Sequence, residues 1–416
     1  MSRWLIVCLV LVTQVAAAEP FRSSGGKNAA RHFATPSLVL VSIDGFGAGM
    51  LSLREARNLR RIAAEGVRAE RLLPVFPTLT FPNHYSIVTG LFPARHGIVA
   101  NDFPLEDGSW YRIRIRPAVA DGANYSGVPV WVAAESQGMV SASFFWVGSE
   151  ADIRGVRPTH FRVFDKNVKP RKRVSQVLKW LREPASTRPR FISMYFEQVD
   201  DNSHWYGPGS SKALDAVARI DRQVGRLYRG IRRLGDGNAV NLVIVSDHGQ
   251  ATHLPQAETF SLAGRIDLEG IQPVDGDSYL FLYFDHPDQQ RAASIRDRVN
   301  AAWKHGRAFT SEDAPPAWQI SGSPRFPDVL LVADVGYRVI SDLENAGDAH
   351  PGDHGWRPEA PEMHGIFIAN GPSLRRGVET GPVRNIDLYP MLLKVLGLEA
   401  MEAYDGDPEA LAHVLR

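Results

Sequence analysis

The sequence predicts an α/β fold with a mainly parallel central sheet that helices cover on both faces. Apolar, β-rich runs alternate along the chain with segments whose apolar residues recur at helical spacing. The predicted buried strands are residues 38–43, 141–146, 191–196 and 242–246. Because strands that alternate with helices pair in parallel and need cover on both faces, we expect a three-layer α/β/α sandwich.

The helical segments show the same alternation. After the first strand, apolar residues recur at three and four positions between Leu53 and Ala63, and residues 214–231 form a longer amphipathic pattern. Residues 386–398 predict a final amphipathic helix. The region from about 250 to 350 is less regular, with a hairpin-like run at 279–283 and a stretch rich in Pro, Ser and Gly at 314–327. We therefore predict an inserted smaller subdomain over about 250–350.

The N-terminal segment has the pattern of an export signal. A positive charge at Arg3 precedes nine apolar residues, 4–12, and small residues follow at 15–18. This apolar run is too short to cross a bilayer comfortably. We expect a signal peptide at 1–18, a linker at 19–36, a catalytic domain at 37–416, and a periplasmic or secreted protein without a transmembrane segment in the mature chain. The single cysteine, Cys8, lies in the signal, so a thiolate metal ligand is excluded from the mature chain.

The overall charge argues against a nucleic-acid or anionic-membrane partner. The 416 residues include 47 Lys and Arg against 46 Asp and Glu, so no strong net field attracts a polyanion. The densest basic run, residues 171–173, is typical of a solvated helix start. No partner protein is implied.

Carboxylate and imidazole groups gather in four separated segments. Asp44 and Asp247-His248 follow predicted strands, Asp200 and His204 are one helical turn apart, and His354 lies in a Gly-Asp-His-Gly turn. Alone, an Asp-Gly pair is common in turns and an Asp/His pair can be a surface ion pair. Together these oxygen and nitrogen groups suit zinc and are numerous enough for two ions. A paired metal site with a hydroxyl nucleophile is typical of phosphoryl transfer.

Thr80 is the candidate nucleophile, and Thr78 is the alternative. We predict a helix over residues 83–90 with Pro82 at its first position, which places Thr80 near the N-cap, where the helix dipole favours negative charge. A plain capping role is the simpler alternative. A hydroxyl is a poor nucleophile unless it is activated, and a bound zinc ion would activate it.

Several landmarks carry a resemblance to a known family. They are Thr80-Phe81-Pro82-Asn83-His84-Tyr85 and its continuation to Pro93, then His96-Gly97-Ile98, Asn101, residues 144–149 and residues 352–355. On these residues, from about Ser37 to the C-terminus, the chain resembles the nucleotide pyrophosphatase/phosphodiesterase family of the alkaline phosphatase superfamily. The resemblance implies an alkaline phosphatase-like fold.

The resemblance also implies a role for each candidate residue. One zinc would be held by Asp200, His204 and His354, and the other by Asp44, Asp247, His248 and the Thr80 oxygen. Asn101 and the backbone N–H of Phe81 would stabilise charge on a phosphate oxygen. Phe81 and Phe164 would sandwich a nucleobase, although relatives often carry tyrosine at the second position. His84 and His96 are expected to be structural, and His364 is not expected to be a ligand.

The implied activity is hydrolysis of phosphodiester and pyrophosphate bonds in small nucleotides, such as nucleotide diesters and nucleoside triphosphates, through a covalent phosphothreonine. A phospholipid or choline phosphodiesterase, or a phosphomonoesterase or phosphonate hydrolase, on the same bimetal core is the alternative. Residues 124–127, where relatives often carry tryptophan, leave the substrate preference open. A non-enzymatic zinc protein is a third possibility, but it would not need to keep a nucleophile.

Overall fold

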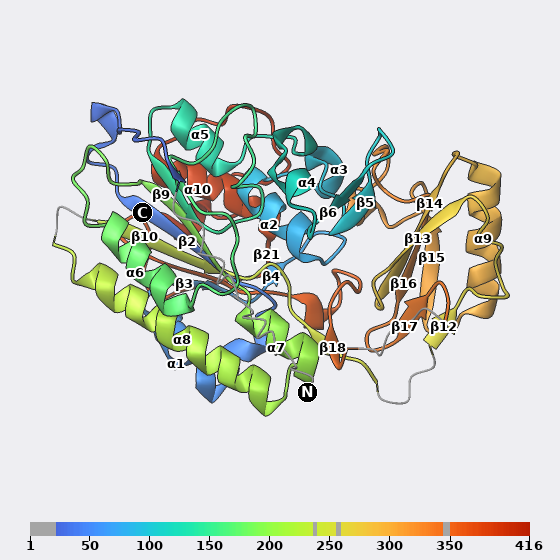
Figure 1. Cartoon of the computed structure of the whole chain (residues 1–416). Helices are drawn as coiled ribbons and strands as arrows, with labels where there is room; N and C mark the ends of the chain where they lie inside the picture. Colours follow the sequence, from blue (N-terminus) through green and yellow to red (C-terminus); the bar gives the residue numbers. More distant parts are fainter. Residues whose placement is uncertain (1–21, 236–238, 255–258, 344–349) are drawn as a thin grey trace, which may run out of the picture.

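The computed structural model describes residues 22–235, 239–254, 259–343 and 350–416, so the predicted export signal lies outside the described residues. A nine-stranded sheet forms the centre of the larger lobe (Figure 1). Its strands, in spatial order, are β1 (Arg22–Ser23), β8 (His160–Phe161), β7 (Ser141–Phe144), β9 (Phe191–Phe196), β2 (Ser37–Ile43), β10 (Val240–Val245), β19 (Phe367–Asn370), β3 (Val67–Ala69) and β20 (Val378–Thr380).

The middle of this sheet is parallel, as the alternation of strands and helices predicts. β2 pairs in parallel with β9 on one side and with β10 on the other, and Ser42 lies opposite both Tyr195 and Val245. β7 and β8 continue the parallel order, whereas β1 and β19 are antiparallel to their neighbours. The carboxyl ends of β2, β9 and β10 therefore meet at one edge.

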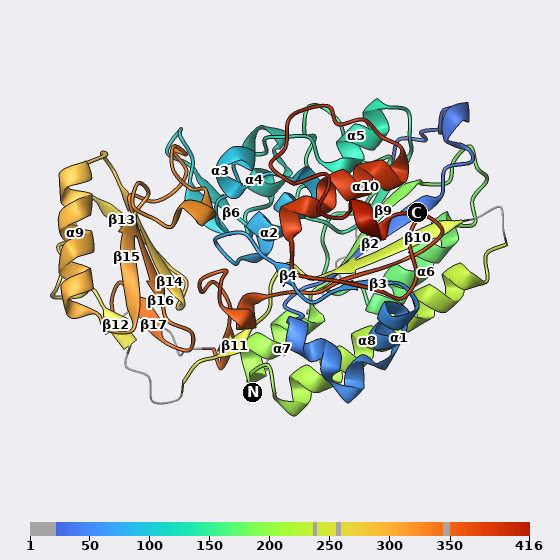
Figure 2. The same cartoon turned by 180° about the vertical axis from the view of Figure 1, so that it is seen from behind.

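Helices cover both faces of the sheet (Figures 1 and 2). One face packs on α1 (Arg57–Glu65), α6 (Pro170–Trp180) and α8 (Ser211–Arg232), and the other on α2 (Thr80–Thr89), α5 (Val130–Ser136) and α10 (Leu388–Leu396). Alternate residues of β2 point to opposite faces of the sheet. Val39 and Val41 pack in the core on the side of α1, α6 and α8, and Leu38 and Leu40 pack in the core on the side of α2, α5 and α10. The other helices are α3 (Pro93–His96), α4 (Arg116–Ala120), α7 (Gln198–Tyr206) and α9 (Gln289–Ala302).

Two sequence expectations are wrong in detail. α2 begins at Thr80 and not after Pro82, which is possible because the first turn of a helix lacks intrahelical partners for its N–H groups. Arg173, expected to be solvated, is fully buried. Its guanidinium binds both carboxylate oxygens of Glu197 at 2.5 and 2.7 Å, which compensates for the loss of water.

A smaller lobe stands beside the sheet (Figure 1). Its antiparallel sheet has the order β13 (Ile271–Asp275), β14 (Tyr279–Phe284), β16 (Val329–Ala333) and β15 (Gly306–Thr310), with α9 packed on it. β12 (Thr259–Ser261) pairs with β17 (Arg338–Ile340) next to it. This lobe has an apolar core of its own, and its strands and helix lie between residues 259 and 340.

Three further short strand pairs lie outside these sheets in the described part of the chain. They are β11 (Ala251–Thr252) with β18 (Gly352–Asp353), β5 (Asp102–Pro104) with β6 (Trp110–Arg112), and β4 (Leu72–Leu73) with β21 (Val383–Arg384). Across the described ranges, the helices lack the combination of length and apolar character that a bilayer crossing requires.

Candidate metal centre and nucleophile

The candidate site lies at the edge where β2, β9 and β10 end. Asp44 directly follows β2, Asp247 comes two residues after β10, and α7, which carries Asp200, follows β9. Gly45 lets these segments approach one another. Its φ is +66°, and a Cβ atom there would lie 2.9 Å from Asp200 Oδ1, so a larger residue would force the two segments apart.

The first cluster consists of Asp44, Asp247 and His248, and it is buried. His248 Nε2 lies 3.1 Å from Asp247 Oδ2 and 3.6 Å from Asp44 Oδ1. Burial and the negative charges of Asp247 and Asp200 raise the pKa of Asp44 well above its ordinary value. Two carboxylates held this close and out of water favour a bound cation.

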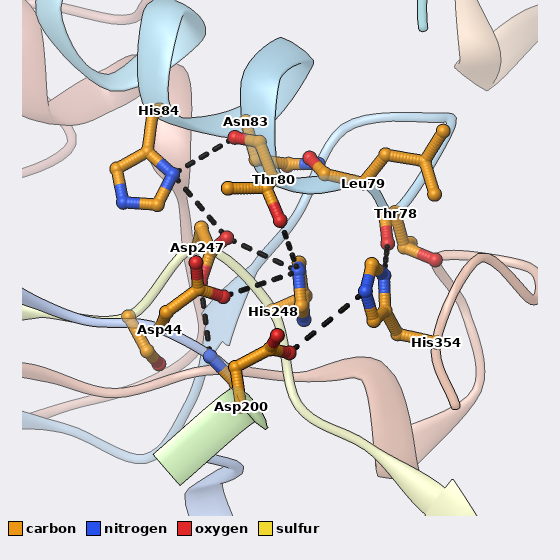
Figure 3. Close-up of polar contacts among 12 residues, drawn as sticks. Asp44, Thr78, Leu79, Thr80, Asn83, His84, Asp200, Asp247, His248 and His354 are labelled. Atoms are coloured by element: carbon orange, nitrogen blue, oxygen red, sulfur yellow. Dashed lines mark hydrogen bonds and ion pairs between the residues drawn. The ribbon is translucent and has the colours of Figure 1, made fainter. Parts of the chain in front are cut away.

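The second cluster consists of Asp200, His204 and His354. His204 Nε2 lies 3.5 Å and His354 Nε2 3.8 Å from Asp200 Oδ1. The two clusters adjoin, because the rings of His248 and His354 stack with their centroids 3.7 Å apart (Figure 3). All six Asp and His ligands expected from the sequence therefore come together in two groups of three.

Two observations show that the residues fit metal ions. Asp44 Oδ1 and Asp247 Oδ2 are buried without a hydrogen-bond partner among the described residues, which is costly unless a cation satisfies them. The Nδ1 atoms of the three histidines lie 2.8–3.0 Å from backbone carbonyls, those of Thr78, Gly249 and Gly352. These bonds leave Nε2 to face the carboxylates, which is the arrangement of metal-ligating histidines.

The structure distinguishes the two candidate nucleophiles. Thr80 is the first residue of α2 and is partly exposed, and its Oγ1 lies 3.5 Å from His248 Nε2 (Figure 3). Thr78 is fully buried: its hydroxyl donates to the Trp356 carbonyl at 2.7 Å and accepts from the Gly355 N–H at 2.9 Å. Thr78 therefore anchors the loop that carries His354, whereas Thr80 faces the first cluster.

Asn101 and Phe81 lie next to Thr80 and bind each other. The Phe81 N–H donates to Asn101 Oδ1 at 3.1 Å. This bond fixes the orientation of the amide and makes Asn101 Nδ2 the side-chain donor that a phosphate oxygen could meet. The Phe81 N–H, expected to bind the substrate directly, is engaged in this structure and would have to share its hydrogen.

Some residues that contact the expected metal ligands were not predicted from the sequence to do so. Tyr195 donates its hydroxyl to Asp44 Oδ2 at 2.5 Å. His84 was expected to be structural. Its Nδ1 lies 3.3 Å from Asp247 Oδ2, and its Nε2 lies 2.8 Å from Ser42 Oγ. Gln250 donates to Asp200 Oδ1. For Tyr195, the signal in the sequence was a hydroxyl group one residue before the carboxyl end of a buried strand.

Three other histidines belong to neither of these two clusters. His364 belongs to neither cluster, and its Nε2 is 3.0 Å from the Pro358 carbonyl oxygen. His96 is buried with its Nε2 2.9 Å from Ser86 Oγ, and burial lowers its pKa to about 3. His253 forms a third group with Asp277 and Asp353, but Arg338 already binds the Asp277 carboxylate.

A cavity of about 360 Å³ opens next to Thr80. Phe81 and Phe164 both line it, together with Phe145, Trp146 and Tyr195. The ring of Phe164 packs edge-on against Phe145 and Tyr195, with centroids 5.1 and 5.9 Å apart. The cavity is thus lined by aromatic rings and opens onto Asp44 of the first cluster.

Comparison with known proteins gives a consistent family match. The model of the type I phosphodiesterase/nucleotide pyrophosphatase family matches residues 38–357. Venom phosphodiesterase CdcPDE of Crotalus durissus collilineatus is 30% identical over 407 residues, covering 95% of this chain and 48% of the relative. The bis(5'-adenosyl)-triphosphatase ENPP4 of Bos taurus is 31% identical over 383 residues, covering 88% and 79%. The chain therefore spans about half the length of the venom relative.

Solved structures agree with the sequence relatives. An inactive murine ectonucleotide pyrophosphatase/phosphodiesterase 5, in complex with AMP, superimposes with a TM-score of 0.84 at 26% identity, over 92% of this chain and 100% of that chain. The human protein of the same name gives a TM-score of 0.83, also at 26% identity, over 91% of this chain and 100% of that chain.

Proposed function

Because this chain belongs to the type I phosphodiesterase/nucleotide pyrophosphatase family, we propose that it hydrolyses phosphodiester and pyrophosphate bonds of small nucleotides with two zinc ions and Thr80 as the nucleophile. The family resemblance and the alkaline phosphatase-like α/β fold predicted from the sequence are both confirmed. The observation that carries the proposal is the position of Thr80, at a helix start and between the first cluster and the aromatic cavity.

The ligand sets would be Asp44, Asp247, His248 and Thr80 for one ion and Asp200, His204 and His354 for the other. When bound, the ions supply positive charge that lowers the pKa of the Thr80 hydroxyl and offsets charge on the phosphoryl oxygens. Tyr195 keeps Asp44 oriented through its hydrogen bond, and the His84 imidazole lies beside Asp247.

The reaction would proceed in two displacements at phosphorus. The Thr80 hydroxyl loses its proton, and Oγ1 forms a bond to phosphorus while the bond to the leaving oxygen breaks. The leaving half departs as an alcohol or a phosphate that takes up a proton, and a phosphothreonine that still carries the nucleoside remains. Water then forms a new P–O bond as the Thr80 Oγ1–P bond breaks, and the nucleoside monophosphate departs. Asn101 Nδ2 donates to a non-bridging oxygen, an interaction worth about 3–4 kcal/mol in comparable sites.

The cavity supports a nucleotide as the substrate. The partly exposed rings of Phe81 and Phe164 offer flat faces for a base. One relative is a bis(5'-adenosyl)-triphosphatase, and one similar structure is a complex with AMP, which supports the same substrate class. The substitution of phenylalanine for the tyrosine common in the family keeps the stacking face and loses only the hydroxyl.

We also propose a location outside the cytoplasmic membrane, in the periplasm or the medium. The N-terminal pattern supports it, as do the names of relatives from venom and of ectonucleotide enzymes. The mature chain would then meet nucleotides outside the cytoplasmic membrane.

A single set of assays tests the proposal. We expect the zinc-loaded protein to turn over an aryl ester of a nucleoside 5′-monophosphate faster than aryl phosphocholine or a simple aryl phosphate, and chelation to stop the turnover. Thr80→Ala should retain its zinc and lose nearly all activity. A preference for the choline ester would favour the lipid alternative, and activity of Thr80→Ala near that of the wild type would refute the nucleophile assignment.

A further inference from the structure

The loop that carries Phe164 has no regular secondary structure, yet both backbone polar groups of Phe164 are held. The Phe164 N–H donates to Glu150 Oε1 at 2.7 Å, and Arg116 Nη2 donates to the Phe164 carbonyl at 2.7 Å. Arg116 Nη1 in turn lies 3.2 and 3.1 Å from the two oxygens of Glu150. The three residues close a ring of charge-assisted hydrogen bonds, which are stronger than neutral ones.

This ring joins segments that are far apart in the sequence. Arg116 is the first residue of α4, Glu150 lies in the turn after β7, and Phe164 follows β8. Only 9% of the Glu150 side chain is exposed, so its carboxylate depends on these partners. The guanidinium carbon of Arg116 also lies 6.0 Å from the centre of the Phe164 ring. All three residues line the cavity beside Thr80.

We infer that the Arg116–Glu150 ion pair is a positioning device that holds Phe164 in place on the wall of the cavity that it shares with Phe81, and thereby sets the preference for base-bearing substrates. The inference rests on the proposed function, since it assigns the base to the gap between Phe81 and Phe164. An aromatic residue on a loop without such hydrogen bonds would lose conformational entropy whenever a base binds, which weakens binding. The ring of hydrogen bonds orders the loop before the base binds, so less entropy is lost on binding.

The test compares two ligands that differ only in the base. Binding of AMP and of ribose 5-phosphate to the zinc-loaded protein is measured by calorimetry, and the ratio of the two Kd values reports the contribution of the base. Since stacking on an aromatic side chain contributes a factor of about 5 to 150, we expect Arg116→Met to reduce this ratio on the order of tenfold. Glu150→Gln, which keeps an acceptor for the Phe164 N–H, should have a smaller effect.

Two comparisons separate positioning from general electrostatics or loss of structure. Arg114→Met removes a positive charge from the same cavity and should shift both Kd values together, leaving the ratio unchanged. Phe164→Ala should reduce the ratio as much as Arg116→Met. The double variant should show no further loss, because the arginine would act only through the ring.

The outcomes distinguish this inference from the proposed function. A wild-type ratio near one would overturn the base subsite and the inference together, whatever the hydrolytic activity. A high wild-type ratio that Arg116→Met leaves unchanged would overturn the inference alone, as would additive losses in the double variant. Absence of nucleotide hydrolysis with an Arg116-dependent ratio would refute only the proposed reaction.

Discussion

Removal of one hydroxyl, by Tyr195→Phe, should weaken metal binding without a change in packing. The Tyr195 hydroxyl donates to Asp44 Oδ2 at 2.5 Å, and burial together with the charge of Asp44 raises the pKa of Tyr195, which keeps the donor protonated. The ring contacts with His84 and Phe164 remain in the variant. The other Asp44 oxygen already lacks a hydrogen-bond partner among the described residues. In the variant, no side-chain hydrogen bond from Tyr195 would fix the orientation of the Asp44 carboxylate.

The magnitude follows from the charge of the acceptor. A hydrogen bond to a charged group contributes about 1.5–3 kcal/mol, and loss of a partner behind a metal ligand typically costs 10–100-fold in affinity. We therefore expect a zinc Kd higher by about 10–100-fold, measured by competition with a chelator of known affinity. Tyr389→Phe is the matched control, since it removes a buried hydroxyl that donates to the Val128 carbonyl at 2.8 Å away from the metal clusters.

The control should lose some stability and keep its zinc affinity. If Tyr195→Phe bound zinc as tightly as the wild type, the carboxylate would be oriented by the metal alone. The account of Tyr195 as the residue that holds Asp44 would then be wrong. Equal weakening in both variants would indicate a general loss of structure.

Three further results are expected. Because burial lowers the pKa of His96 to about 3, the unfolded chain binds a proton below about pH 6.5 that the folded chain does not. The free energy of unfolding should fall by about 2 kcal/mol from pH 7 to pH 5 on this account. The fall over the same pH range should be smaller by that amount in His96→Gln, and an equal fall in both proteins would contradict the assignment. Thr78→Val should lower the free energy of unfolding by about 2–3 kcal/mol because it unpairs two buried backbone groups. Thr89→Val removes a hydroxyl that donates to the Tyr85 carbonyl within the same helix, and it should lower the free energy of unfolding by less than half as much in the same denaturant titration. Chelation should lower the Tm, since the Asp44 and Asp247 carboxylates then repel each other, and zinc should restore it; a Tm insensitive to chelator would argue against a metal centre.

Much of the architecture could be predicted because its signals are local. The apolar run that became β2 and the amphipathic pattern that became α8 are visible within short windows, and the ends of β2 and β10 locate Asp44 and Asp247. The donor types at these ends also indicate the chemistry. By contrast, the start of α2 was placed too late, since the first turn of a helix tolerates proline at more than one position.

The sequence by itself determined the alternation of strands and helices, the family and the carboxylate and imidazole groups available to a metal site, because periodicity and side-chain chemistry are properties of the chain. Only the tertiary structure decided that Thr78 is an internal anchor, that Arg173 is buried against Glu197, and that Arg116 reaches Phe164. These facts depend on which distant segments meet, and a hydrogen bond across 48 residues leaves no local pattern.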